Sequence, residues 1–201
     1  MNEAKYPFEL HITVKTPGDL DQFRATCLKL GVKPVFIDYQ LQLGSTIDDV
    51  MTSNRWIDSY DTVVEYSAKI KKSLEQHGYN VCRIKIETIP THPEALQQTT
   101  FTNQYYEAHV AIRTTPHHIN NISNVCKYHH AHMSRNPFKV IDQSIVQMCT
   151  IRTFEANYDK FTTSVYALIQ DLTHYGTIDK PELEFAIYDS NITHDSAWIS
   201  T

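Results

Sequence analysis

Two short segments of the sequence each place a glutamate two positions before a histidine. Residues 8–14 read FELHITV and contain Glu9 and His11, and residues 106–112 read YEAHVAI and contain Glu107 and His109. An imidazole exchanges protons near neutral pH, and a neighbouring carboxylate can orient it or favour its charged form. His11 and His109 are therefore candidate catalytic residues, one acting as general base and the other as general acid.

Both segments alternate apolar and polar residues, which is the period of a β-strand with one covered face. In the first segment the apolar positions 8, 10, 12 and 14 are expected to face the core. Successive side chains of a strand point to opposite faces, so Glu9, His11 and Thr13 should line the other face.

Neighbouring strands are expected to add further polar side chains to this face. We predict that the substrate is bound there by Glu9, Thr13, Thr52, Lys85, Glu107, Thr150 and Arg152. The same face should also carry Asn54, Arg83, Glu87, Glu182 and Glu184. The alternative interpretation is a solvated surface on which the Glu–His pairs are ordinary surface contacts. Two charged central strands are more than a soluble sheet requires, and this favours a binding face.

The run Leu10-His11-Ile12-Thr13-Val14 resembles the hydrophobic-His-x-Thr-hydrophobic motif of the 2H phosphoesterases. Those are duplicated proteins in which two such strands face each other across a cleft. The resemblance implies that His11 and His109 act on a nucleotide-type or cyclic phosphate ester without a metal, and that Thr13 contacts the phosphate. Opposed imidazoles suit in-line phosphoryl displacement. The second motif has Ala111 in place of threonine, so Thr150 or Arg152 would have to supply the second contact.

A non-catalytic function is the alternative, because duplicated ferredoxin-like units often bind small ligands or partners without chemistry. The missing second hydroxyl favours it. The strand from Glu9 to Lys15 is also similar to the ExExK strand of the triphosphate tunnel enzymes, although only the first glutamate and the lysine match. No cofactor and no metal site are predicted, because the histidines between His117 and His132 lack suitably spaced cysteine or carboxylate partners.

The two segments belong to a longer internal repeat. An offset of 98 residues carries His11 to His109 and Gly78 to Gly176, and it also relates the apolar positions of the intervening helices. The predicted fold class is α+β: a tandem duplication of a ferredoxin-like βαββαβ unit, with antiparallel sheets and a pseudo-twofold cleft between them.

Each unit is expected to contain the elements of that order. In the first, helices are predicted at 19–30 and 59–78, and strands at 8–15, 35–41, 50–56 and 82–87. In the second, the first helix is predicted at 119–128. The domain boundaries follow: repeats at 1–90 and 104–190, a connector at 91–103 and a C-terminal tail at 191–201.

Composition narrows the function classes. The chain of 201 residues has a formal charge of −5 and a pI near 6.1, which disfavours general binding of nucleic acids or anionic membranes. Glycine occurs only 5 times and no phosphate-binding glycine motif is present. Four widely spaced cysteines indicate reduced thiols, and no long apolar stretch is present, so a cytoplasmic location is predicted. The expected partner is a small phosphate ester or nucleotide, and the oligomeric state is not predicted.

Overall fold

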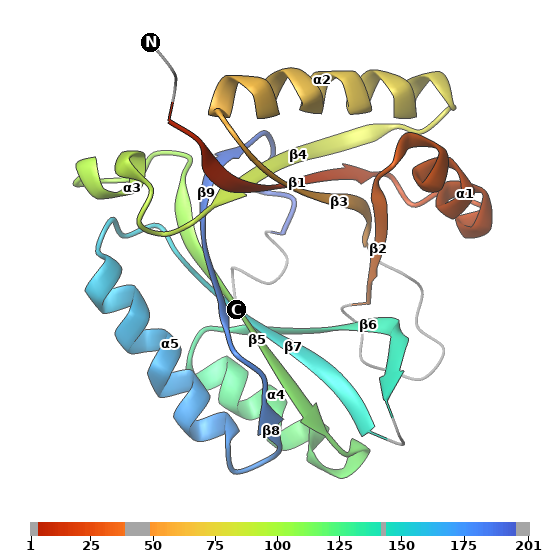
Figure 1. Ribbon diagram of the computed structural model, residues 1–201. Helices are drawn as coiled ribbons and strands as arrows, with labels where there is room; N and C mark the ends of the chain where they lie inside the picture. The colour runs from red at the N-terminus through yellow and green to blue at the C-terminus, as the bar shows by residue number, and fades with distance from the viewer. Residues whose placement is uncertain (1–3, 39–48, 142–143, 196–201) are drawn as a thin grey trace.

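The computed structural model describes residues 4–38, 49–141 and 144–195, with side chains omitted at 136–144 (Figure 1). The first half contains β1 (Tyr6–Val14), α1 (Leu20–Leu30), β2 (Lys33–Ile37), β3 (Asp49–Asp58), α2 (Tyr60–Gln76) and β4 (Val81–Thr88). A short helix, α3 (Pro93–Gln97), follows. The second half contains β5 (Tyr105–Thr114), η1 (Pro116–His118), α4 (Ile119–Tyr128), β6 (His132–Ile141), β7 (Ser144–Thr153), α5 (Tyr158–Leu172), β8 (Thr177–Ile178) and β9 (Glu182–Asp189).

The strands form one antiparallel sheet in the order β2-β3-β1-β4-β9-β5-β7-β6, with β8 paired to β5. The two halves join where β4 pairs with β9. The two ends of this path also meet. Asp38, directly after β2, exchanges both backbone hydrogen bonds with Arg135 of β6, at 2.9 and 3.0 Å. The sheet therefore curls into a barrel that is closed at this bridge.

The helices cover the outer face of the barrel, α1 and α2 over the first half and α4 and α5 over the second (Figure 1). Their starts carry conventional caps: the side chains of Asp19, Ser59 and Asn157 accept hydrogen bonds from backbone N–H groups of the first turns of α1, α2 and α5. Gly31 ends α1 with φ 68°, a left-handed conformation that glycine adopts without steric cost.

The hydrophobic core lies between the helices and the outer face of the sheet. In β1 the outward-pointing side chains are fully buried against α1 and α2: Phe8, Leu10, Ile12 and Val14. The helices contribute apolar residues at helical spacing, such as Val63, Ile70 and Leu74 of α2 and Phe161, Leu168 and Leu172 of α5. The predicted alternation of β1 is confirmed, and its polar face is the inside of the barrel.

The order βαββαβ and the α+β class agree with the prediction, but the predicted cleft between two separate sheets does not form. The edge strands β4 and β9 hydrogen-bond to each other, because an exposed edge offers unpaired backbone groups that another strand satisfies. The connector contains α3, whose Ala95 packs into the core. The predicted turn near Gly44 and the terminal residues 196–201 lie outside the described residues.

All four cysteines are free thiols, as predicted. No helix in the described part of the chain is both long enough and apolar enough to cross a membrane.

Candidate functional site

The inner face of the barrel carries both histidines. His11 of β1 lies between Ser53 of β3 and Lys85 of β4. His109 of β5 occupies the corresponding position in the second half, between Thr150 of β7 and Glu182 of β9. The neighbours of each histidine along its strand are buried in the core beneath the helices, so both histidines point to the opposite face, into the barrel: Leu10, Ile12, Ala108 and Val110.

Each imidazole contacts two carboxylates. His11 Nε2 lies 3.0 Å from Glu87 Oε2 and 3.5 Å from Glu9 Oε1. His109 Nε2 lies 3.4 Å from Glu184 Oε2 and 3.6 Å from Glu107 Oε2. The predicted Glu-x-His pairs therefore do interact, and each gains a second glutamate from the last strand of its half.

The two histidines border one shared group of side chains. Donor atoms of Glu87, His109 and Glu184 all lie within 4.8 Å of one another. Because His11 contacts Glu87 as well, a single carboxylate stands between the two imidazoles.

Buried cations hold the glutamates. Lys85 Nζ lies 2.7 Å from Glu87 Oε1 and 2.8 Å from Glu107 Oε2. Arg152 Nη2 lies 2.6 Å from Glu107 Oε1 and 2.7 Å from Asp195 Oδ2. The partners of each charge are themselves buried, so the interior is a connected ionic network rather than a hydrophobic core.

The network continues toward the other ends of these strands. Arg83 donates to Asp189 of β9 at 2.6 and 2.9 Å and to Asp195 at 2.9 and 3.1 Å. The hydroxyl of Tyr105 donates to Asp189 at 2.7 Å. The C-terminal segment thus returns a carboxylate, Asp195, into the barrel, where it bridges Arg83 and Arg152.

The network sets the protonation states of its members. Burial opposes a charge on His109, but contacts with Glu184 and Glu107 outweigh it and raise its pKa to about 9. Burial, followed by the charge of Glu87, raises the pKa of Glu184. Burial also opposes the charge of Glu87, but Lys85 and His11 outweigh it and lower its pKa to about 2. Adjacent carboxylates in one interior therefore have pKa values shifted in opposite directions.

Of the predicted binding residues, all but Thr52 lie on the inner face of the barrel. Thr150 accepts or donates a hydrogen bond at 3.0 Å with His109 Nδ1, and Arg152 pairs with Glu107, as their predicted positions require. Thr13 is buried on the inner face, one step beyond His11 along β1, between Met51 and Arg83. Whether these side chains bind a substrate remains a prediction.

The placement of Thr52 was wrong. Thr52 pairs with Ile12 and therefore faces the helices, as does Asn54, which pairs with Leu10. Ser53 takes the predicted position and donates to Glu9 Oε1 at 2.6 Å. The offset of 98 residues maps Thr52 onto Thr150, but the register of β3 differs from it by one residue, and a shift of one residue reverses the face.

A pocket opens at the end of the barrel where β1 begins. Its volume is about 730 Å³. Its charged lining residues are Glu9, Arg55, Glu87, Lys180, Glu182 and Glu184, and its apolar lining includes Pro7, Ile57, Ile89 and Leu183. Four carboxylates thus face two cations. Arg55 is already engaged, by Glu9 and, at 3.2 Å, by Glu182. The pocket is acidic.

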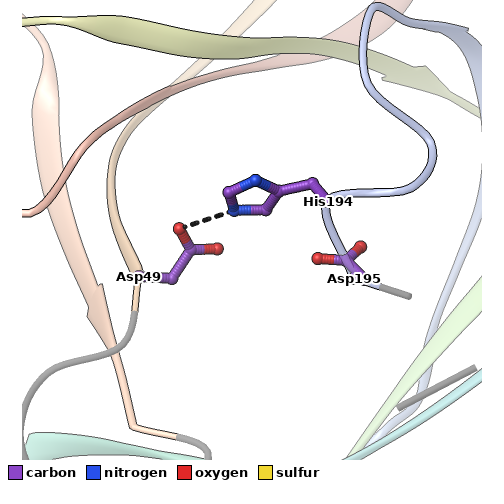
Figure 2. A group of neighbouring side chains, drawn as sticks. All are labelled: Asp49, His194 and Asp195. Carbon is purple, nitrogen blue, oxygen red and sulfur yellow. Dashed lines mark hydrogen bonds and ion pairs between the residues drawn. The ribbon is translucent and has the colours of Figure 1, made fainter. Parts of the chain in front are cut away.

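A second group of potential metal ligands lies at the C-terminal turn. His194 Nε2 contacts Asp49 Oδ1 at 3.1 Å, with Asp195 beside them (Figure 2). The Asp49 hydrogen bond, opposed by burial, raises the pKa of His194. Both oxygens of Asp195 already accept from Arg83. This group therefore anchors the C-terminal segment to the start of β3.

Sequence reasoning missed Ser53, Arg55, Tyr105 and Asp195. Ser53 and Arg55 can be assigned to the inner face from the alternation of β3, but only once the register of this strand with β1 is known. Asp195 lies beyond the last strand, where no periodic pattern indicates that the chain turns back into the barrel.

No family model matches this sequence, and no curated protein is similar to it. Among solved structures, the acetolactate synthase small subunit of Thermotoga maritima is 12% identical, with 91% of this chain and 95% of that chain covered and a TM-score of 0.31. A heme-binding protein of Thermus thermophilus is 10% identical, with coverages of 100% and 99% and a TM-score of 0.30. A mutant chlorite dismutase of Candidatus Nitrospira defluvii is 8% identical, with coverages of 96% and 94% and a TM-score of 0.29. Similarity at this level carries no information on ligand or activity.

Proposed function

We propose that the protein binds a small, positively charged organic molecule in the acidic pocket at the open end of the barrel. The observation that carries this proposal is the charge of the lining. Glu9, Glu87, Glu182 and Glu184 face the pocket against Arg55 and Lys180. Glu87 is paired with Lys85 inside the barrel, but Glu9 and Glu182 share the single guanidinium of Arg55, so these two carboxylates retain an excess of negative charge over that cation.

The form of the pocket supports a ligand with an apolar body. Its volume of about 730 Å³ lies within the range of pockets that bind small molecules, roughly 300–1,000 Å³. Ile57, Ile89 and Leu183 supply apolar surface beside the carboxylates. The side chains of Glu9 and Glu184 are only 12% and 15% exposed, and carboxylates with little access to water attract an ammonium group more strongly than the same groups in bulk solvent. An aromatic or alkyl amine combines both features.

Calorimetric titration with three matched probes tests this proposal. Benzylamine, benzyl alcohol and benzoate share one apolar body and differ in charge. Benzylamine should bind, benzyl alcohol more weakly and benzoate not at all. Glu182→Gln should weaken benzylamine binding several-fold, because Glu182 lines the pocket, whereas Glu155→Gln on an exposed loop should not. Benzoate binding as tightly as benzylamine would refute the proposal.

A phosphoesterase is the second candidate, favoured by one observation: both histidines border the same carboxylate, that of Glu87. Two hydroxyls also lie beside the imidazoles, those of Ser53 and Thr150. An anionic ester would have to approach several glutamates, which is why we rank it second. Hydrolysis of a 2′,3′-cyclic nucleotide tests it, and His11→Ala and His109→Ala should each lose about 10²–10⁴-fold.

We further infer that the site was formed by duplication of one βαββαβ unit. In each half the Glu-x-His strand is flanked by a hydroxyl, an arginine and a glutamate. The first set is Glu9, His11, Ser53, Arg55 and Glu87, and the second is Glu107, His109, Thr150, Arg152 and Glu184. The site then combines one contribution from each unit. Sequences of relatives in which the two halves are more alike would support this inference, and relatives with a single, unrelated half would contradict it.

A further inference from the structure

The spacing of two inner carboxylates and one imidazole fits a single metal ion. Bonds of about 2.0–2.2 Å in tetrahedral geometry place ligand atoms about 3.3–3.6 Å apart. His109 Nε2 and Glu184 Oε2 are 3.4 Å apart, and the donor atoms of Glu87 lie within 4.8 Å of both. His11 Nε2 lies 3.0 Å from Glu87 Oε2 but is not one of this group of three. One imidazole and two carboxylates are thus gathered, which leaves a fourth position of the ion for another ligand.

The surrounding network contains more negative than positive groups, and a dication would offset the difference. Six carboxylates are linked to four permanent cations. The carboxylates are Glu9, Glu87, Glu107, Glu184, Asp189 and Asp195, and the cations are Arg55, Arg83, Lys85 and Arg152. Adding Glu182, which also contacts Arg55, would enlarge the difference. Metal binding requires neutral imidazoles, and with both histidines neutral the difference is two charges, which one divalent ion would remove.

Glu87 provides a second, independent indication. Its side chain is only 1% exposed, yet neither oxygen accepts a well-aligned hydrogen bond from any residue that the structure describes. Lys85 and His11 stand at ion-pair distance without that alignment. A buried carboxylate normally has its oxygens satisfied, so this group is oriented for a ligand that binds by charge.

We propose that Glu87, His109 and Glu184 bind one divalent first-row transition-metal ion such as Zn²⁺. Mixed imidazole and carboxylate ligands suit this class of ion. The inference goes beyond the proposed function but uses two of the same carboxylates: Glu87 and Glu184 also line the pocket, so a bound dication would compete with an ammonium group for them.

The group at the C-terminal turn does not compete for this role. Both oxygens of Asp195 already accept hydrogen bonds from Arg83, and Arg152 contacts one of them as well, so this carboxylate has no oxygen left for an ion. His194 provides a matched control for substitution of His109. It is also a histidine paired with a buried carboxylate, that of Asp49, but it lies outside the proposed site (Figure 2).

Calorimetric titration of the chelator-treated 201-residue chain with Zn²⁺ tests the proposal. One ion should bind per chain. Glu184→Gln and His109→Ala should each weaken binding by more than about 100-fold, since loss of even an outer partner of a metal ligand costs about 10–100-fold. His194→Ala should bind as the unaltered protein does. If a variant fails to fold, the thermal midpoint remains informative: Zn²⁺ must raise it as its concentration exceeds Kd, and it must do so equally in the unaltered protein and in His194→Ala.

Several results would overturn the metal site. They are absence of Zn²⁺ binding to the unaltered protein, binding that His194→Ala abolishes, and binding that Glu184→Gln and His109→Ala leave unchanged. The benzylamine titration separates this inference from the proposed function. Amine binding without Zn²⁺ binding refutes the metal site alone, and Zn²⁺ binding without amine binding refutes the organic ligand alone.

Discussion

Replacing Lys85 by methionine removes the cation at the centre of the interior network. Its ammonium group lies 2.7 Å from Glu87 and 2.8 Å from Glu107, and both glutamates are 1% exposed. Methionine keeps most of the apolar stem and fills a similar volume, so the change acts mainly through the charge. Two buried carboxylates would lose a shared partner.

The magnitude follows from what each carboxylate retains. Removing one partner of a buried ion pair costs about 3–5 kcal/mol, because the other charge stays buried without compensation. Glu107 keeps Arg152 at 2.6 Å and Glu87 keeps His11 at 3.0 Å. The free energy of unfolding should therefore decrease by about 3 kcal/mol, the lower end of this range. With a urea m-value of about 2 kcal/mol per molar, the midpoint should fall by about 1.5 M.

Urea unfolding of metal-free protein, followed by circular dichroism, measures this difference. Lys160→Met is the matched control. Its ion pair with Glu155 is 3.2 Å long but the side chains are 71% and 66% exposed, and exposed pairs contribute about 0–1 kcal/mol. If Lys85→Met destabilises by less than about 1 kcal/mol, the interior is not the tightly coupled ionic network described above.

Two further perturbations probe the frame around the site. Because the folded-state pKa of His194 is raised, its pair with Asp49 should stabilise fully below pH about 6.5 and lose that contribution as the pH rises through the raised value. His194→Asn should thus cost about 1 kcal/mol in urea unfolding at pH 5.5 and less at pH 8.5, and an equal cost at both would argue against the ion pair. A Cβ on Gly176 would lie 2.2 Å from the carbonyl oxygen of Arg113, so Gly176→Ala should lower stability by about 1–3 kcal/mol. Gly18→Ala, with open space around its Cβ, should have little effect, and equal melting temperatures of the two variants would count against the packing of β8 on β5.

The sequence predicted the inner face of the central strands because alternation determines which side chains share a face. Glu9, His11, Glu107 and His109 were identified in this way, and Glu182 and Glu184 were placed correctly on β9. Alternation says nothing about the pairing register of a neighbouring strand. Thr52 was assigned to the inner face by the repeat offset, and one residue of difference put it on the outside and Ser53 within.

Closure of the barrel could not be predicted from local patterns. It depends on β4 pairing with β9 and on the bridge between Asp38 and Arg135, contacts between residues about half the chain apart. Such pairing makes one enclosed interior out of two open faces. It also explains why so many charges are buried: the residues that alternation marks as polar meet one another instead of water, and each must be neutralised by another.

Crystals grown with Zn²⁺, with diffraction data collected at the zinc absorption edge, test the central claim most directly. We predict one strong anomalous peak inside the barrel, about 2.0–2.2 Å from His109 Nε2 and from one oxygen each of Glu87 and Glu184. A barrel interior without a peak, or a peak on Asp49 and His194 instead, would contradict the assignment of these two carboxylates and this imidazole as a cation site.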